Sequence, residues 1–203
     1  GAKEGISYAK GRTSGLLDYR VLKGGYLNEV TSSSACEMTD GMPSGADLLD
    51  PSSYDKVHSV VSTQDFCMVM DSVELCLYCS EWALGALTLK DAAELFQAVT
   101  GIDMGEKEMI RAVVRIRDLE RAFWVREGFT RKDDHLEGKI KNEAVPDGPH
   151  KGEKMDEAKF EKMLDEYYQL RGWDVKTGVP TKEKLLEDGL ADVVEDLEKR
   201  GKL

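Results

Sequence analysis

Residues 106–126, EKEMIRAVVRIRDLERAFWVR, decide the fold class of this 203-residue chain. Apolar side chains recur there every three or four residues, which is the spacing of one face of an α-helix. The repeating positions are Met109, Ile110, Val113, Val114, Ile116, Leu119 and Phe123. Gly128 follows them, and glycine is a typical residue just past a helix C-terminus. The pattern predicts a long amphipathic helix from about Glu106 to Arg126.

Similar patterns lie on both sides of this stretch. Apolar spacing, N-terminal caps and glycine stops predict five further helices: from Tyr54 toward Asp71, from Thr88 to Gly101, from Asp156 to Gly172, from Pro180 to Gly189 and from Leu190 to Arg200. Strand patterns are few. The sequence therefore predicts an all-α fold, an irregular helical domain of about six to eight helices with a loop-rich N-terminal quarter.

Composition divides the chain into four segments of one expected domain, residues 1–203. Residues 1–53 are rich in Gly and Ser and should be mostly loop, with room for short helices. Residues 54–128 and 156–203 carry the helices. Residues 129–155 are charged and contain Pro and Gly, which predicts a surface excursion. Within it, the mixed-sign run RKDD at 131–134 predicts a solvated turn.

The net charge limits the partners of the chain. Lys and Arg total 28, Asp and Glu total 39, and the formal net charge is −11. Non-specific nucleic-acid binding needs a basic face that neutralises phosphates, so we expect no nucleic-acid partner. Because no apolar run approaches the roughly 20 residues of a membrane-spanning helix, we expect no membrane partner and a cytoplasmic location.

The chemistry concentrates in residues 65–79, DFCMVMDSVELCLYC. This window holds Cys67, Cys76 and Cys79, three of the four cysteines, and in a reducing compartment such clustering favours metal or redox chemistry over disulfides. Cys76 follows Asp71 by five residues in an expected turn flanked by apolar side chains. A cysteine in that setting can ligate an iron–sulfur cluster. Four thiolates are the usual complement, so the others would come from Cys36, Cys67, Cys79 or further polypeptide.

Two simpler interpretations remain open for these thiols. Free cysteine is among the most commonly buried residue types, so any of them can be an inert core thiol. Cys76 and Cys79 also form a C-x2-C pair, which is compatible with zinc, although no second pair completes a tetrahedral site in the sequence.

At this window the chain resembles a known family. DSVELC at 71–76 is similar to the D-x-x-G-L-C motif of the tungsten-containing aldehyde:ferredoxin oxidoreductases. Further matches stand in that family's order and spacing: REGFTRKDD at 126–134, VPDGP at 145–149, LDEYYQLRGWD at 164–174 and GVPTKEKL at 178–185. Together they cover about residues 49 to 190.

The resemblance implies a role for each matched position. Asp71 would hydrogen-bond the pterin of a tungsten bis-molybdopterin cofactor, and Cys76 would be a ligand of a [4Fe–4S] cluster. Leu75 would pack beside them, and the backbone of Glu74 would lie near the pterin, although the family usually has Gly there. Upstream, Glu37 stands where the family has a His near the substrate, so it is the candidate catalytic proton carrier.

For the whole enzyme, the resemblance implies oxidation of a small aldehyde to a carboxylate, with electrons passing through the cluster to ferredoxin, in an anaerobe. The chain matches about the last third, the helical C-terminal domain, with residues 54–128 on the cofactor side. Other domains would supply the remaining cysteines and the pterin saddle. The chain alone would then bind neither cofactor and be inactive, its partners would be those domains, ferredoxin and the aldehyde, and there is room for a homo-oligomer.

Two alternatives stay beside this interpretation. Glu74 and Glu37 are compatible with a divergent member of the superfamily whose redox reaction has changed. A non-catalytic helical interaction module that holds zinc with Cys67, Cys76 and Cys79 would explain the thiols but not the downstream motifs.

Overall fold

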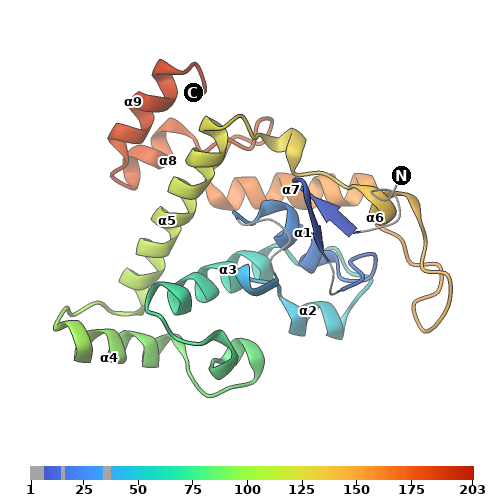
Figure 1. Ribbon diagram of the computed structural model, residues 1–203, viewed down its shortest axis with the longest axis horizontal. Coiled ribbons are helices and arrows are strands. Elements are labelled where there is room, and N and C mark those ends of the chain that lie inside the picture. The colour runs from blue at the N-terminus through green and yellow to red at the C-terminus, as the bar shows by residue number, and fades with distance from the viewer. Residues whose placement is uncertain (1–6, 15–16, 34–37) are drawn as a thin grey trace.

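The computed structural model describes residues 7–14, 17–33 and 38–203, and Figure 1 shows that this part of the chain is almost entirely helical. Its α-helices are α1 Lys23–Thr31, α2 Ser44–Leu49, α3 Val57–Ser72, α4 Leu89–Thr100, α5 Glu106–Arg126, α6 Gly138–Asn142, α7 Glu157–Arg171, α8 Lys182–Glu187 and α9 Ala191–Lys199. Short 3-10 helices lie between them: η2 Met38–Asp40, η3 Leu77–Cys79, η4 Glu81–Ala83 and η5 Arg131–Asp133. The all-α expectation is confirmed.

One small antiparallel ribbon accompanies the helices. Strand β1, Ser7–Ala9, pairs with β2, Arg12–Ser14. The two-residue turn between them places Lys10 and Gly11 in the left-handed region, at φ 48° and 83°. Left-handed conformation at both central residues is the geometry that matches the twist of a tight hairpin.

The long helices begin and end where local sequence signals place them. At the start of α4, the Asp91 N–H donates to Thr88 Oγ1 at 3.2 Å and the Thr88 N–H donates to the Asp91 carboxylate at 2.8 Å. This reciprocal pair is a capping box, which satisfies two otherwise unpaired amides. Gly101 and Gly172 end α4 and α7 in the left-handed conformation that favours glycine. Helix α5 has the predicted bounds.

Helix α1 lies in the segment that the sequence predicts to be mostly loop. All nine of its residues are buried, so it has no solvated face and therefore no amphipathic pattern. Its first turn is satisfied from outside, because the Asp47 carboxylate in α2 accepts hydrogen bonds from Gly24 N–H at 2.9 Å and Gly25 N–H at 2.6 Å. A cap supplied from 22 residues away leaves no local signal.

Three apolar clusters hold the helices together. The largest packs α1, α3, α6 and α7 around Tyr26, Val60 and Phe160. A second joins the end of α3 to α4 and the first half of α5, and a third joins the end of α5 to α8 and α9. In Figure 1, α8 and α9 accordingly lie at one end of α5, and α4 lies at the other.

Polar side chains also fix α3 against α7. Arg171 donates to Asp65 Oδ1 at 2.6 Å and to Gln64 Oε1 at 2.9 Å, and Tyr167 Oη donates to the same Gln64 oxygen at 2.8 Å. All four side chains are buried. Buried polar groups that satisfy one another specify a single arrangement of the elements that carry them, so this network sets the position of α3.

The run at 131–134 is not a solvated turn, and the expectation for it is wrong at Asp134. The Asp134 side chain is fully buried and pairs with Arg121 of α5 at 2.6 Å and with Lys10 of the ribbon turn at 2.7 Å. Tyr168 Oη also donates to it at 2.6 Å. A local mixture of charges resembles a solvated turn, but here the cations that pair with the carboxylate come from distant segments.

Candidate functional site

The end of α3 builds the first half of the candidate site. Glu74 N–H donates to the Asp71 carbonyl at 3.2 Å, and Leu75 N–H donates to the Met70 carbonyl at 2.9 Å. Glu74 lies between these bonds in the left-handed conformation, at φ 60°. These two bonds around a left-handed residue form a Schellman motif, which closes a helix and turns the chain sharply. Helix α3 therefore ends abruptly beside Asp71.

The second half is the turn that begins at Cys76. Cys79 N–H donates to the Cys76 carbonyl at 2.9 Å and opens η3. The turn is held at its far end because the Cys79 carbonyl accepts from Leu87 N–H at 3.0 Å. Gly85 passes so close to that carbonyl that a Cβ there would collide with it, so this approach requires glycine. In Figure 1 this loop runs from the end of α3 around the lower edge of the molecule to α4.

An apolar base lies under the turn. Leu77 is buried in the cluster formed with Met70 of α3 and Val113 of α5, while Leu75 and Trp82 are partly buried against it. The anchoring leaves the neighbouring side chains outside, and Asp71, Glu74, Cys76 and Cys79 are all exposed. The sequence therefore brings two carboxylates and two thiols to the surface on a short, pinned segment.

Cys67 is separate from these exposed thiols. It lies on the inner side of α3 with 0% of its surface exposed. Burial, reinforced by the nearby carboxylates of Asp40 and Asp71, raises the pKa of its thiol. Because its side chain is enclosed in the apolar cluster of α3, α4 and α5, Cys67 is a core thiol. The zinc hypothesis that groups it with Cys76 and Cys79 loses one of its three ligands.

The other predicted site residue, Glu37, lies outside the described residues, as does Cys36. Just beyond them, Asp40 pairs with the buried Arg117 of α5 at 3.1 Å. Sequence reasoning missed Arg117. The sequence feature that could have revealed it is its position four residues after Val113, because residues i and i+4 share one face of a helix and Val113 lies on the inward face of α5.

Two surface hollows accompany the site. A groove of about 990 Å³ runs along α3, η4 and the start of α5, and its lining includes Phe66, Trp82, Leu84 and Ile110. Leu84 is 98% exposed at its edge. The other three side chains are partly buried. A groove of partly buried apolar side chains with an exposed leucine at its edge is typical of an interaction surface.

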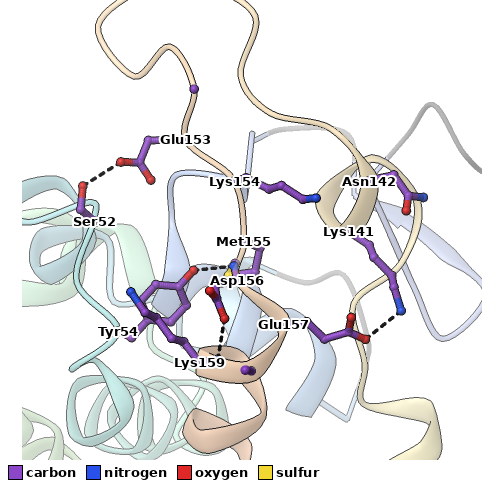
Figure 2. A pocket seen from close by; sticks show the side chains of 12 residues that line it. Ser52, Tyr54, Lys141, Asn142, Glu153, Lys154, Met155, Asp156, Glu157 and Lys159 are labelled. Atoms are coloured by element: carbon purple, nitrogen blue, oxygen red, sulfur yellow. Dashed lines mark hydrogen bonds and ion pairs between the residues drawn. The ribbon is translucent and has the colours of Figure 1, made fainter.

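The second hollow, of about 800 Å³, lies around the N-terminus of α7 and is shown in Figure 2. Its lining mixes both charges, and some of them already have partners within the lining. Lys141 contacts Glu157 at 2.8 Å, and Ser52 donates to Glu153 at 3.0 Å. The start of α7 is already capped by Asp156. This hollow does not select a ligand of one charge.

Within residues 7–14, 17–33 and 38–203, no group of three or more His, Cys, Asp or Glu side chains is placed to hold a metal ion. Across the same residues, none of the helices combines the length and the apolar character that crossing a bilayer requires. The fold and the site thus define a class: an all-helical domain that offers a cysteine and a carboxylate at its surface without surrounding them with further ligands.

Comparisons with known proteins show the family of this helical domain. A family model described as aldehyde ferredoxin oxidoreductase, domains 2 and 3, matches residues 1–190. The tungsten-containing aldehyde ferredoxin oxidoreductase of Pyrococcus furiosus is 35% identical over 141 residues, which are 69% of this chain and 22% of that protein. The protein of the same description from Pyrococcus abyssi is 33% identical over 143 residues, 70% of this chain and 22% of the relative.

A solved structure of a differently described enzyme is also similar to this chain. The active site complex BamBC of benzoyl coenzyme A reductase, in complex with 1,5 dienoyl-CoA, has a TM-score of 0.61 with 26% sequence identity. The similarity covers 72% of this chain and 21% of that chain. The chain belongs to the aldehyde ferredoxin oxidoreductase family, and it spans about a fifth of the length of the curated relatives it matches.

Proposed function

We propose that the chain acts as the helical C-terminal domain of a tungstopterin oxidoreductase that oxidises aldehydes to carboxylates and passes the electrons to ferredoxin. In this proposal Cys76 supplies one ligand of a [4Fe–4S] cluster, and Asp71 hydrogen-bonds the pterin. The observation that carries it is the exposure of both side chains on one pinned segment of a chain that belongs to the family.

The residues present fit one side of such a cluster. Thiolates are the usual ligands of iron–sulfur clusters, and apolar surroundings help to set their potential. Cys76 is an exposed thiol above the apolar base of Met70, Leu77 and Val113. Because the described residues form no complete ligand set, the other thiolates would come from elsewhere in the enzyme.

The residues also fit a pterin contact. An ionised carboxylate accepts hydrogen bonds from the N–H groups of a heterocycle, and Asp71 presents its carboxylate at the surface of the last turn of α3. Glu74 adopts the left-handed backbone conformation that glycine adopts at the lowest steric cost. The departure from the family's glycine thus leaves the turn in place and adds a side chain near the proposed pterin.

The chemistry of the reaction would belong to the cofactor, which supplies a two-electron redox centre when bound. The part of this chain is to position and enclose it. The Schellman turn orients Asp71, the Cys79 to Leu87 hydrogen bond holds the Cys76 turn, and the apolar base excludes water from beneath. Glu37, in the segment outside the described residues, remains the proposed proton carrier.

The remaining partners follow from the same proposal. The rest of the enzyme would cover the turn and the adjoining apolar groove, because both lie on the α3 and η4 side. Ferredoxin and a small aldehyde would be partners of the assembled enzyme, in the cytoplasm of an anaerobe.

A dye-linked assay of the full-length parent enzyme tests this function. The parent should reduce a viologen dye with a short aldehyde, and Asp71→Asn should lower turnover about 10- to 100-fold, because a hydrogen bond to a charged group is worth about 1.5–3 kcal/mol. Asp103→Asn is the matched control, since Asp103 is an exposed carboxylate in the loop between α4 and α5. It should leave turnover unchanged.

A second candidate is a family member with an altered redox reaction. The Glu74 side chain favours it, because a carboxylate beside the proposed pterin adds charge where glycine has none. A parent enzyme loaded with tungsten that fails to oxidise any short aldehyde would establish this second candidate and overturn the first.

A further inference from the structure

Two exposed thiols lie at the two ends of one tight turn. Cys76 and Cys79 are both free and exposed, whereas Cys67 is sealed in the core. The proposed function uses only Cys76. Cys79 is therefore a second reactive group beside the proposed iron ligand, and it has no role in that function.

The turn brings the two residues within the reach of a disulfide. The Cys79 N–H to Cys76 C=O hydrogen bond of 2.9 Å makes them the first and last residues of a hydrogen-bonded turn. The Cα atoms at those two positions of a β-turn lie within about 7 Å. A disulfide joins Cα atoms about 4.4–6.8 Å apart, so the ends of such a turn lie in the range of separations that a disulfide can span.

The structure also keeps the turn in place. Leu77 is buried between the two cysteines, and Ser80 Oγ donates to the Leu77 carbonyl at 2.6 Å. The Cys79 carbonyl is held by Leu87 N–H. A segment already ordered loses little further entropy when its ends are joined, which favours an intramolecular bridge over two separate mixed disulfides.

We propose that Cys76 and Cys79 form a reversible disulfide when Cys76 is not bound to iron and a disulfide oxidant is present, so that the turn is a thiol–disulfide switch. With a small disulfide such as oxidised glutathione as the oxidant, one thiolate attacks its S–S bond and releases one glutathione thiolate. The second cysteine attacks the resulting mixed disulfide and releases the other. The protein loses two protons and two electrons, and one glutathione disulfide becomes two thiols.

The bridge has a consequence that rests on the proposed function. A sulfur in a disulfide cannot ligate iron, because the ligand is the thiolate. Oxidation would hold the chain in a form that accepts no cluster, and reduction would release it. Cys79 thereby protects Cys76 from the irreversible steps of thiol oxidation.

Mapping the bridge in the purified chain tests the proposal directly. The chain is equilibrated with reduced and oxidised glutathione, quenched with acid, alkylated under denaturing conditions and analysed by peptide mass spectrometry. We expect loss of free thiol from both Cys76 and Cys79, a bridged peptide that contains both, and full reversal by dithiothreitol. Glutathione on each of the two cysteines, or a bridge from Cys76 to Cys36 or Cys67, would overturn the proposal.

Two variants sharpen this result. Cys79→Ser should replace the bridge by a single glutathione on Cys76, whereas Cys36→Ser should leave the bridge intact. The circular dichroism spectra of both variants should match that of the wild type, which shows that they fold normally. A Cys79→Ser chain that still loses its Cys76 thiol without gaining glutathione would also contradict the switch.

Iron uptake by the full-length apoenzyme then separates the bridge from the proposed function. The oxidised wild-type apoenzyme should take up iron only after dithiothreitol. If the bridge is mapped and iron uptake is nevertheless normal before reduction, the bridge stands and the assignment of Cys76 as a cluster ligand fails.

Discussion

Glu74 holds a left-handed backbone conformation that a side chain makes unfavourable. Its φ is 60°, and its Cβ gains nothing in return because the side chain is exposed. A non-glycine residue in this region costs about 1 kcal/mol or more. Glu74→Gly should therefore raise the free energy of unfolding by about 1 kcal/mol, as measured by urea denaturation of the chain.

Glu74→Ala is the matched control for this prediction. Alanine also carries a Cβ, so it should bring no comparable gain, although it removes the same carboxylate. Equal stabilisation by Ala and Gly would mean that the charge of Glu74, and not its backbone conformation, is the unfavourable feature.

Residue identity predicted part of the site, and tertiary contacts decided the rest. The family motif singles out Asp71 and Cys76, and the structure places both at the surface; the left-handed backbone of Glu74 was not predicted and is a finding of the structure. The burial of Cys67 was not readable, because helical spacing alone does not tell which side of α3 the neighbouring helices α4 and α5 will cover.

The ribbon, α5 and α7 meet at one buried carboxylate. Asp134 accepts from Lys10, Arg121 and Tyr168 and has no solvent exposure. Removing one partner of a buried ion pair typically costs about 3–5 kcal/mol, because the remaining charge is left without compensation. We expect Asp134→Asn to lower the free energy of unfolding at neutral pH by about that amount. Asp147 is an exposed carboxylate in the same segment, so Asp147→Asn should change the free energy of unfolding little.

The same group predicts a pH dependence. Burial acts to raise the pKa of Asp134, but Arg121 and Lys10 outweigh it and the net shift is downward. A carboxyl whose pKa is lower in the folded state stabilises the fold above its unfolded pKa of about 4 and loses this contribution as pH falls. Acid titration of stability should thus be shallower in Asp134→Asn than in the wild type. Parallel titrations would contradict this pairing.

The sequence predicts helices that have one solvated face. It does not predict a fully buried helix, or a helix face whose buried side chains are polar. The bounds of α5 follow from its spacing, yet Leu119 and Phe123 are 40% and 52% exposed, while Arg117 and Arg121 point inward to Asp40 and Asp134. Helix α1 has no exposed residue, so no periodicity marks it. In both cases the deciding partners lie far away in the sequence.

At the scale of the whole molecule, the site lies at one end of the helical assembly and the C-terminal helices lie at the other. The cluster of α3, α4 and α5 supports the Cys76 turn, while α8 and α9 pack at the far end of α5. The chain accounts for about a fifth of the length of its curated relatives. The exposed Cys76 turn lies next to an apolar groove, which is the arrangement we expect if this domain contributes one thiol to a cluster shared with the rest of the enzyme.

The iron content of the full-length enzyme, measured together with the paramagnetic signal of its reduced cluster, tests the ligand role of Cys76 most directly. Cys76→Ser should lose most of the iron and the signal, because serine offers no thiolate. Cys79→Ser, three residues further on the same turn, should keep both. A Cys76→Ser enzyme with full iron and an unchanged signal would contradict the account.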